Sequence, residues 1–233
     1  MLLVPSPGFE QCHGPDLFDH CTFTGNSAQD DGGAVFLAGD SPNFDHCTFD
    51  RNSTLNGSAG GTILCSTITH TGIPSNPVLN NCILGFAAEG AAIHCLEGSV
   101  PTLRCCDVFG NSGGDWYGCI AGQAGEQGNL ALDPLFCGAE HGDYTLNAAS
   151  PCAPIHNPEC GRIGAWPVAC GAAVGACCLS DGSCFLATPE DCAGHQGRYR
   201  GDGIPCGLTP CVPVATRSVT WGRIKSMYRD ATR

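Results

Sequence analysis

The sequence predicts an all-β fold: a parallel β-helix, or solenoid, of about four to six coils, followed by a small disulfide-rich module and a short amphipathic tail. The main observation is a repeat. The string at residues 18–26 returns at residues 44–52 with its first six letters and its last letter unchanged. Residues 103–111 are a weaker copy, and residues 81–84 are a degenerate one.

A second short string falls between these copies. It reads Gly-Gly-Ala-Val at residues 32–35, Gly-Gly-Thr-Ile at 60–63 and Gly-Ala-Ala-Ile at 90–93. Two apolar strings that alternate every 20 to 35 residues or so are typical of a repeat protein. The glycines suit tight corners between strands, and the 33 glycines and 16 prolines of the chain favour short strands over long helices.

Each copy contains a short strand that only the neighbouring coils can cover. In Cys47-Thr48-Phe49, side chains alternate, so the cysteine and the phenylalanine face inward and the threonine outward. Stacking such strands gives columns of like residues. The asparagine that ends each copy tolerates left-handed backbone and can hydrogen-bond along its column. The predicted structural ladder therefore consists of Cys21, Phe23, Asn26, Cys47, Phe49, Asn52, Cys82, Cys106 and Asn111.

We expect three parts along the chain: a β-helix over residues 1–170, a six-cysteine module over 171–211 and a basic tail over 212–233. Within the β-helix, the step from Cys47 to Cys82 is longer than its neighbours, so that coil extrudes a loop. Residues 120–170 are expected to form the closing coil and its cap, because an open stack end exposes strand edges.

Two motif pairs resemble a known family. Phe23-Thr-Gly-Asn26 precedes Gly32-Gly-Ala-Val35, and Phe49-Asp-Arg-Asn52 precedes Gly60-Gly-Thr-Ile63. These pairs resemble the phenylalanine-x-x-asparagine and glycine-glycine-alanine-isoleucine repeats of polymorphic outer membrane proteins. The resemblance implies a right-handed parallel β-helix, surface display and adhesion. Residues 129–136 look like the closing coil of secreted bacterial β-helix proteins.

The module is predicted to be held by disulfides rather than by a large core. Ser180–Ser183 reads as a hairpin turn, and Thr188–Asp191 reads as a helix start with a threonine cap. The remaining thirteen cysteines are an odd number, so at least one stays free or pairs outside the β-helix. The module resembles a cysteine-rich module of secreted bacterial proteins, and its six cysteines are Cys177, Cys178, Cys184, Cys192, Cys206 and Cys211.

Two further expectations concern cysteine geometry. Neighbouring cysteines such as Cys105 and Cys106 rarely bond to each other, so each should find another partner or stay free. Stacked cysteines such as Cys65 and Cys95 lie one strand spacing apart, somewhat beyond bonding distance. Many ladder cysteines are therefore expected to be buried thiols that act as small apolar residues.

The tail has the pattern of a short amphipathic helix. Trp221, Ile224 and Tyr228 lie at helical spacing, with basic residues between them. The tail is expected to dock on the acidic body, to contact an anionic surface or to be read by a sorting system.

Charge and cysteine content limit the classes of partner. Residues 1–216 hold five basic and 21 acidic residues, a net charge of −16, which disfavours nucleic acid and anionic surfaces as partners. Nineteen cysteines in 233 residues indicate an oxidising compartment. The start of the sequence does not read as a signal peptide, so we expect the signal and the earliest coils to lie upstream of Met1. The localisation predicted is extracellular or cell-surface, with no transmembrane segment.

Candidate sites in the repeats are weak. Asp30 and Asp31 at a corner are calcium candidates, although two acids supply few ligands. His20 and His46 precede the ladder cysteines and should face outward as ordinary surface residues. A lyase would need a basic residue on one ladder face, and the repeats offer only Arg51 and Arg104.

The function predicted is a non-catalytic extracellular or cell-surface scaffold for adhesion to a glycan or a surface protein, with no cofactor. The alternative is a carbohydrate-active β-helix enzyme, a polysaccharide lyase or hydrolase, with degenerate or missing catalytic coils. A carbohydrate-binding module would need exposed aromatic residues on a ladder face, and Trp116 and Tyr117 are the only adjacent aromatic pair.

Overall fold

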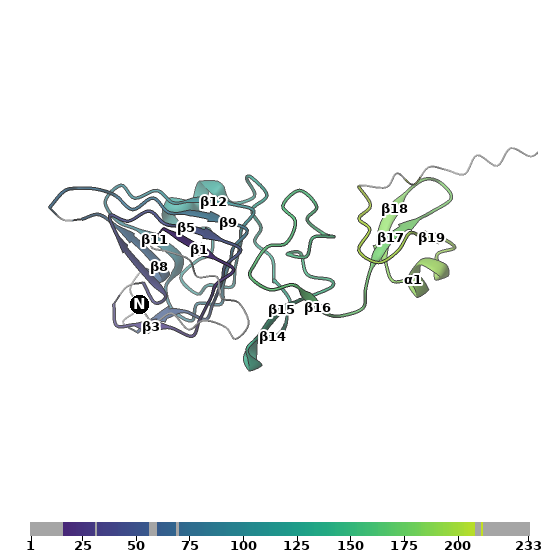
Figure 1. Cartoon of the computed structure of the whole chain (residues 1–233), viewed down its shortest axis with the longest axis horizontal. Helices are drawn as coiled ribbons and strands as arrows, with labels where there is room; N and C mark the ends of the chain where they lie inside the picture. The colour runs from purple at the N-terminus through teal and green to yellow at the C-terminus, as the bar shows by residue number, and fades with distance from the viewer. Residues whose placement is uncertain (1–15, 31, 56–59, 69, 208–210, 212–233) are drawn as a thin grey trace, which may run out of the picture. The chain divides into compact units, whose positions relative to one another are not determined.

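The computed structural model describes residues 16–30, 32–55, 60–68, 70–207 and 211. The chain divides into two compact units, residues 1–173 and 174–233. The first is a parallel β-helix with a segment folded against its side, and the second is a small disulfide-rich module (Figure 1). The predicted fold class is confirmed. The predicted tail lies outside the described residues.

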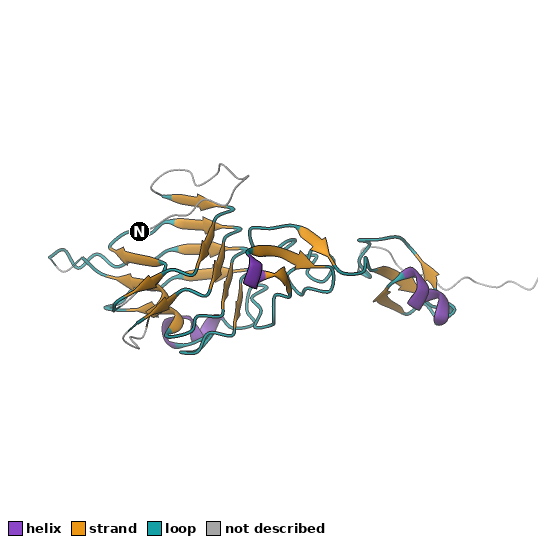
Figure 2. Ribbon diagram, turned by 90° about the horizontal axis from the view of Figure 1, so that it is seen from below, coloured by secondary structure: helices purple, strands orange, loops and turns teal. Residues whose placement is uncertain are grey.

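The β-helix is built from parallel ladders to which successive coils each add one strand (Figure 2). The first sheet has the order β1 (Leu17–Asp19), β5 (Asn43–Asp45), β9 (Val78–Asn80), β12 (Thr102–Arg104). The second has the order β2 (Thr22–Thr24), β6 (Thr48–Asp50), β10 (Ile83–Gly85), β13 (Asp107–Phe109). The third has the order β4 (Val35–Ala38), β8 (Gly60–Ser66), β11 (Ala91–Cys95). A short pair, β3 (Ser27–Ala28) and β7 (Ser53–Thr54), links the second sheet to the third.

The core lies between these sheets and consists of columns of like residues. Phe18 stacks on Phe44 with ring centroids 4.9 Å apart, and Phe23 stacks on Phe49 at 4.5 Å. Phe49 is fully buried. Because the coils pair in register, an inward residue in one coil is inward in the next. Aliphatic side chains continue both columns: Leu79 and Leu103 after Phe44, and Leu84 and Val108 after Phe49.

The turn between the first two sheets is made by one residue in the left-handed region on every coil. His20, His46, Asn81 and Cys105 occupy this corner, with φ between 47° and 52°. The structure corrects the expectation that the two histidines lie on a strand. They face outward because the corner, rather than strand alternation, directs their side chains.

Asparagine side chains join each coil to the one before it. The Asn52 Oδ1 accepts hydrogen bonds from the Asn26 backbone N–H (3.1 Å) and from Asn26 Nδ2 (2.9 Å), and Asn52 Nδ2 donates to the Phe23 carbonyl. Asn111 contacts the backbone of Ala87 and Leu84 in the same way. The ladder of amides predicted from Asn26, Asn52 and Asn111 is therefore interrupted at Ala87. The interruption is tolerated because each asparagine contacts the preceding backbone.

The inward cysteines follow the corner on successive coils. The N–H groups of Thr48, Ile83 and Asp107 donate to the carbonyls of Cys21, Cys47 and Cys82, so these residues and Cys106 form one column. All four are buried. Cys21 is disulfide-bonded, whereas Cys47, Cys82 and Cys106 are free thiols. Each free thiol lies 3.2–3.4 Å from the carbonyl oxygen two residues earlier, which it contacts at the corner.

A short 3-10 helix, η1 (Gly118–Gln123), caps the end of the stack after β11 and β12. Ile120 is fully buried in the core, and the Cys95–Cys119 disulfide fastens the cap. The Gln123 side chain accepts from the Leu103 N–H and donates to the Pro101 carbonyl, so it pairs with the edge of β12. A buried stack end thus keeps its backbone groups satisfied.

The closing coil and cap predicted for residues 120–170 are formed only in part. The helix η1 and the parallel bridge between Asp107 and Leu130 close the stack, whereas residues 133–170, called here the side segment, leave it. They carry a separate small sheet with the order β14 (Phe136–Gly138), β15 (Asp143–Asn147), β16 (Val168–Cys170) and the 3-10 helix η2 (Ala139–His141). Ile83 on the outer face of the second sheet packs with Leu146, Cys152 and Ile163. The Cys105–Cys160 disulfide joins the segment to the corner column. The segment therefore covers one side of the stack instead of its end.

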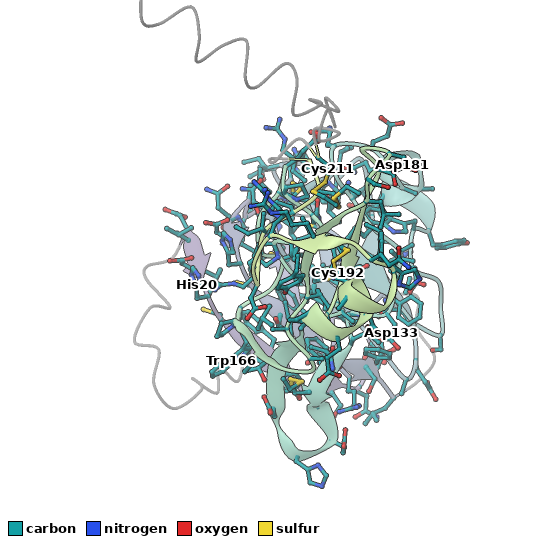
Figure 3. All side chains as sticks on the ribbon, turned by 90° about the vertical axis from the view of Figure 1, so that its right-hand side faces the viewer. His20, Asp133, Trp166, Asp181, Cys192 and Cys211 are labelled. Atoms are coloured by element: carbon teal, nitrogen blue, oxygen red, sulfur yellow. A yellow bond between two sulfur atoms is a disulfide. The ribbon has the colours of Figure 1, made fainter. Side chains whose placement is uncertain are left out.

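The second unit is an antiparallel sheet with a helix. Strand β17 (Gly175–Cys178) pairs with β18 (Cys184–Ala187) and β19 (Arg198–Tyr199). Helix α1 (Pro189–Gly194) begins at Thr188, whose side chain accepts from the Asp191 N–H, as the sequence indicated. Cys192 and Cys211 are labelled in Figure 3, and the three disulfides of the unit are Cys177–Cys192, Cys178–Cys211 and Cys184–Cys206.

The asparagine contacts predict unequal effects for two similar substitutions. Asn52→Ala leaves the Asn26 N–H without its acceptor and removes a side-chain hydrogen bond to the Phe23 carbonyl, at a cost of roughly 1–3 kcal/mol. Asn26→Ala removes one side-chain bond to Asn52 and should cost about 1 kcal/mol. Urea denaturation of the full chain, followed by circular dichroism, measures both. Equal losses would contradict the role assigned to the asparagine of the following coil.

Reducing agent should act on the two units differently. The second unit has a small core, centred on Cys177, Ala187 and Cys192, so loss of its three disulfides should unfold it. The stack is held by in-register strands, and its buried columns do not depend on a bond between stacked cysteines. Hydrogen exchange in dithiothreitol should show fast exchange over β17 and slow exchange over β6 and β10. Fast exchange over β6 would contradict this.

Candidate functional site

The side segment covers a row of polar side chains on the outer face of the second sheet. Thr22 Oγ1 accepts from Trp166 Nε1 at 2.9 Å, and Thr48 Oγ1 accepts from the Ala165 N–H at 3.0 Å. Both threonines are buried. In a bare β-helix these hydroxyls would face solvent and be available to a ligand. Here the side segment satisfies them.

Asp107 is one of two fully buried acids of this row. Its Oδ1 accepts from the Leu132 N–H at 3.1 Å, and its Oδ2 accepts from the Cys152 thiol at 3.2 Å. Asp107 and Cys152 are fully buried. Burial raises the pKa of Asp107 to about 6 and raises the pKa of Cys152 far above its usual range. Cys152 is therefore a neutral donor at physiological pH.

Asp50 is the second buried acid of the row. It accepts from the Tyr144 hydroxyl at 3.2 Å and forms an ion pair with Arg51 at 3.2 Å, while its Oδ1 has no hydrogen-bond partner. Burial raises the pKa of Asp50, and the charge of Arg51 opposes that rise. Tyr144 in turn contacts the Thr24 hydroxyl. Arg51 therefore serves Asp50 as a counter-ion.

The two acids do not form the pair that a glycosidase requires. Asp50 lies on β6 and Asp107 on β13, with β10 between them, so about 10 Å separates their strands. The carboxyl groups of retaining enzymes lie about 5 Å apart, and those of inverting enzymes lie about 6.5–9.5 Å apart with a water between them. Asp50 is in register with Phe109 rather than with Asp107, so the two acids are also offset by two residues along the strands. Both acids are also covered by the side segment. Their position is that of buried structural carboxyls.

The histidine corner forms a charged contact between the stack and the side segment. His20 and His46 stack with ring centroids 4.8 Å apart. Arg162 Nη2 donates to His20 Nε2 at 2.8 Å, and His20 Nδ1 donates to Asp19 at 2.6 Å. Burial lowers the pKa of His46, and the positive charge of Arg162 lowers it further, while the carboxylate of Asp45 opposes the shift.

Metal binding at this corner is opposed by its own contacts. Asp19, His20 and His46 have ligand atoms within 4.8 Å of one another. The parallel imidazole rings, however, do not direct two nitrogens at one point, and the guanidinium of Arg162 already occupies one nitrogen of His20. The corner is best described as a link between coils and side segment.

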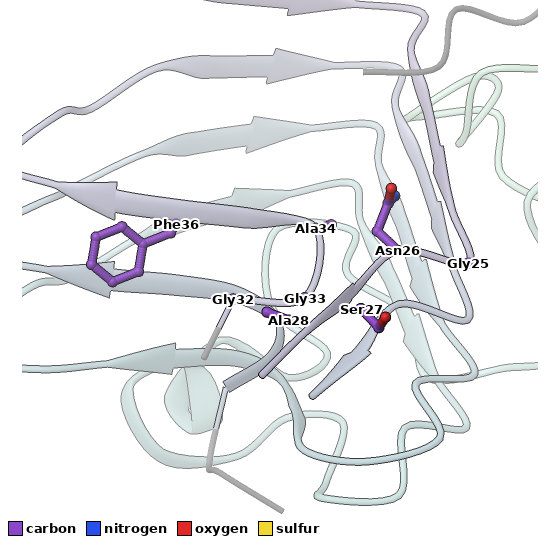
Figure 4. Close-up of a pocket in the computed structure, with 8 residues that line it drawn as sticks. All are labelled: Gly25, Asn26, Ser27, Ala28, Gly32, Gly33, Ala34 and Phe36. Atoms are coloured by element: carbon purple, nitrogen blue, oxygen red, sulfur yellow. The ribbon is translucent and has the colours of Figure 1, made fainter. Parts of the chain in front are cut away.

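A pocket of about 470 Å³ lies on the first coil (Figure 4). Glycine and alanine form much of its wall, and Phe36 stands at one end (Figure 4). Val35 and Leu37 face the core and are buried, whereas the Phe36 side chain faces outward and is 59% exposed. The lining residues are Gly25, Asn26, Ser27, Ala28, Gly32, Gly33, Ala34 and Phe36. None of them carries a charge.

The remaining candidates from the sequence lie apart from one another. Asp30 is exposed and belongs to no possible metal-binding group within the described part of the chain, and Asp31 lies outside that part. Arg104 is exposed on β12. Trp116 Nε1 donates to the Leu130 carbonyl beside the cap, and Tyr117 is 59% exposed.

The ladder cysteines offer no reactive thiol. Cys47, Cys65, Cys82, Cys106 and Cys152 are free and buried. Burial raises the pKa of Cys65 to about 12, and the pKa of Cys82 lies well above its usual value. Cys65 and Cys95 are stacked in register without bonding, and Cys95 bonds to Cys119 instead. A thiolate nucleophile is therefore strongly disfavoured at Cys65 and Cys82.

Sequence reasoning missed several residues that complete the structure. Asn129 accepts from the Cys106 N–H and donates to the Leu103 carbonyl, which repeats the action of the ladder asparagines after the last full coil. Its position in the string before Leu130 is a signal that could have been recognised. The exposed ring of Phe36 also follows from alternation between Val35 and Leu37. Tyr144 and Trp166 carry no comparable signal, because no repeat contains them.

Comparison with known families matches residues 20–38 to the Chlamydia polymorphic membrane protein (Chlamydia_PMP) repeat. The chain is a parallel β-helix repeat protein with a repeat of this type, as the sequence motifs indicated. The match spans the first coil from the histidine corner to the end of β4, and it contains all the described residues that line the pocket. No curated protein and no solved structure matches the chain.

Within the described residues, no helix has the length and apolar character needed to span a membrane.

Replacing the buried carboxyl of Asp107 with an amide should stabilise the fold, and the size of the gain should depend on pH. The pKa of Asp107 is about 6 in the folded chain and 3.8 in the unfolded chain. Well below pH 3.8 the carboxyl is neutral in both states, so its burial does not lower the free energy of unfolding. The cost grows as pH rises to about 6 and is constant above, reaching at most about 3 kcal/mol. Asp107→Asn keeps an acceptor for the Leu132 N–H, so this variant should be more stable than the parent at pH 7.

Urea unfolding of both chains between pH 4 and pH 8 measures the difference. The stability gap should be near zero at pH 4, widen up to pH 6 and then remain level. Asp40→Asn removes an acid from an exposed position and controls for net charge. A variant less stable than the parent at every pH would show that the carboxylate itself is needed.

Proposed function

We propose that this protein is a non-catalytic scaffold displayed outside the cytosol, where its β-helix contacts a glycan or a surface protein. The observation that carries the proposal is the polymorphic membrane protein repeat at residues 20–38, which covers the first coil from the histidine corner to the end of β4. The coarser conclusion, a surface-type β-helix scaffold, follows from that repeat and from the fold. Adhesion is the proposed step beyond it.

The disulfides support a location outside the cytosol. Six disulfides are placed among the described residues, three in the β-helix unit and three in the module. They fasten the cap, the side segment and the second unit, all of which lie outside the stacked columns. Disulfides at these positions persist in an oxidising compartment.

The alternative is a carbohydrate-active enzyme, which the two buried acids with raised pKa values on one sheet favour. The spacing of Asp50 and Asp107 and the cover of the side segment weigh against it, as does the pairing of Arg51 with Asp50. Turnover of a polysaccharide that is lost in Asp50→Asn or Asp107→Asn would favour the enzyme over the scaffold.

A membrane-impermeant biotin reagent applied to intact cells of the source organism tests the location. The protein should be labelled without lysis, and alkylation before reduction should find the six module cysteines oxidised. A cytosolic protein labelled in parallel controls for leakage. Labelling only after lysis, with the same cysteines reduced, would overturn the proposal.

A further inference from the structure

We propose that the pocket on the first coil is a binding site for a neutral glycan, with Phe36 as the surface on which one sugar ring stacks. This inference rests on the proposed surface-contact function and names the chemistry of the contact. The pocket volume, about 470 Å³, lies in the range of small-molecule sites.

Phe36 is the first reason to expect a sugar. Its position pairs with Leu64 on the next coil and His94 on the one after, so among the described strands it is the only aromatic hydrocarbon ring in that outward column. Leu64 is 1% exposed, whereas Phe36 is 59% exposed. The face of an aromatic ring carries partial negative charge and attracts polarised C–H groups such as those on one face of a sugar.

Polar groups at the other end of the pocket supply hydrogen bonds. Asn26 directs its N–H and Nδ2 at Asn52, so its Oδ1 accepts no hydrogen bond within the described part of the chain. Ser27 is exposed. The carbonyls of Asn26 and Ala28 accept from the next coil, so the N–H and C=O of Ser27 point away from it. Amide, hydroxyl and backbone groups of this kind match the hydroxyl groups of a sugar.

The wall between these ends allows a close approach to the backbone. Gly32, Gly33, Ala28 and Ala34 present no large side chain there (Figure 4). A Cβ added to Gly33 would lie 2.4 Å from the carbonyl oxygens of Gly61 and Ser53, so packing against the second coil requires glycine at this position. The shape of the pocket is therefore set by the stack itself.

The charge of the site points to a neutral ligand. Among the described residues that line the pocket none is charged, so they offer no counter-ion for a carboxylate or a sulfate. Residues 1–216 carry a net charge of −16, which repels anionic polysaccharides over longer distances. A neutral oligosaccharide needs no counter-ion and is not repelled by the negative charge of the chain.

The test measures binding of neutral hexasaccharides to the full chain by saturation-transfer NMR and titration calorimetry. The probes are cellohexaose, maltohexaose, laminarihexaose and mannohexaose, with hexagalacturonate as the anionic probe. At least one neutral probe should bind saturably, and Phe36→Ser should weaken that binding about fivefold or more. Tyr117→Ser, which removes an equally exposed ring elsewhere, should leave it unchanged.

Failure of this inference is distinguishable from failure of the proposed function. No saturable binding of any neutral probe, unchanged binding in Phe36→Ser, or preference for hexagalacturonate overturns the glycan site. Binding of an extended peptide without any hexasaccharide binding also overturns it. Surface labelling of intact cells tests the scaffold function independently. Circular dichroism spectra of the two serine variants should match the parent, because both rings are exposed.

Discussion

The structure depends on in-register stacking of parallel coils. Because each strand pairs with the same position of the next coil, a corner or side chain that fits one level must fit the neighbouring levels. The left-handed corner shows this constraint: histidine, asparagine and cysteine occupy it in turn with nearly the same φ. Non-glycine residues pay a conformational cost there, and the asparagine contacts and backbone bonds between coils offset it. This constraint explains why the same residues recur at matching positions of successive repeats.

The same constraint leaves the outer faces free to differ. The second sheet has its outer face covered by the side segment, and its threonines and acids are satisfied or neutralised there. The first coil carries an exposed ring beside a pocket. The stack thus provides a rigid support, while the contacts specific to this chain lie on its surface. A site fixed by backbone stacking, such as the pocket wall at Gly33, is held in place before any ligand binds.

The stacked columns could be predicted from the sequence because their partners lie one period away and share their letters. The side segment could not, since Tyr144 bonds to a residue 94 positions earlier and Trp166 to one 144 positions earlier. No periodic pattern links such partners. The exposed ring at the pocket could have been predicted, because the alternation of Val35 and Leu37 places the Phe36 ring outside. A single exposed ring on a ladder face is a weaker sequence signal than an adjacent aromatic pair such as Trp116 and Tyr117.

The division of the cysteines into buried free thiols and disulfide-bonded residues explains how a chain with nineteen cysteines adopts one structure. In-register strands hold stacked side chains about 4.8 Å apart, whereas the two Cβ atoms of a disulfide lie about 3.8 Å apart. Cys65 and Cys95 illustrate the result, since they are stacked but not bonded. Burial then raises the pKa of the Cys65 thiol to about 12, so almost no thiolate exists to attack a neighbouring disulfide. Once coils have stacked, the buried free thiols are withdrawn from exchange, whereas Cys95 and Cys105, although they belong to columns, bond to Cys119 and Cys160 outside the columns.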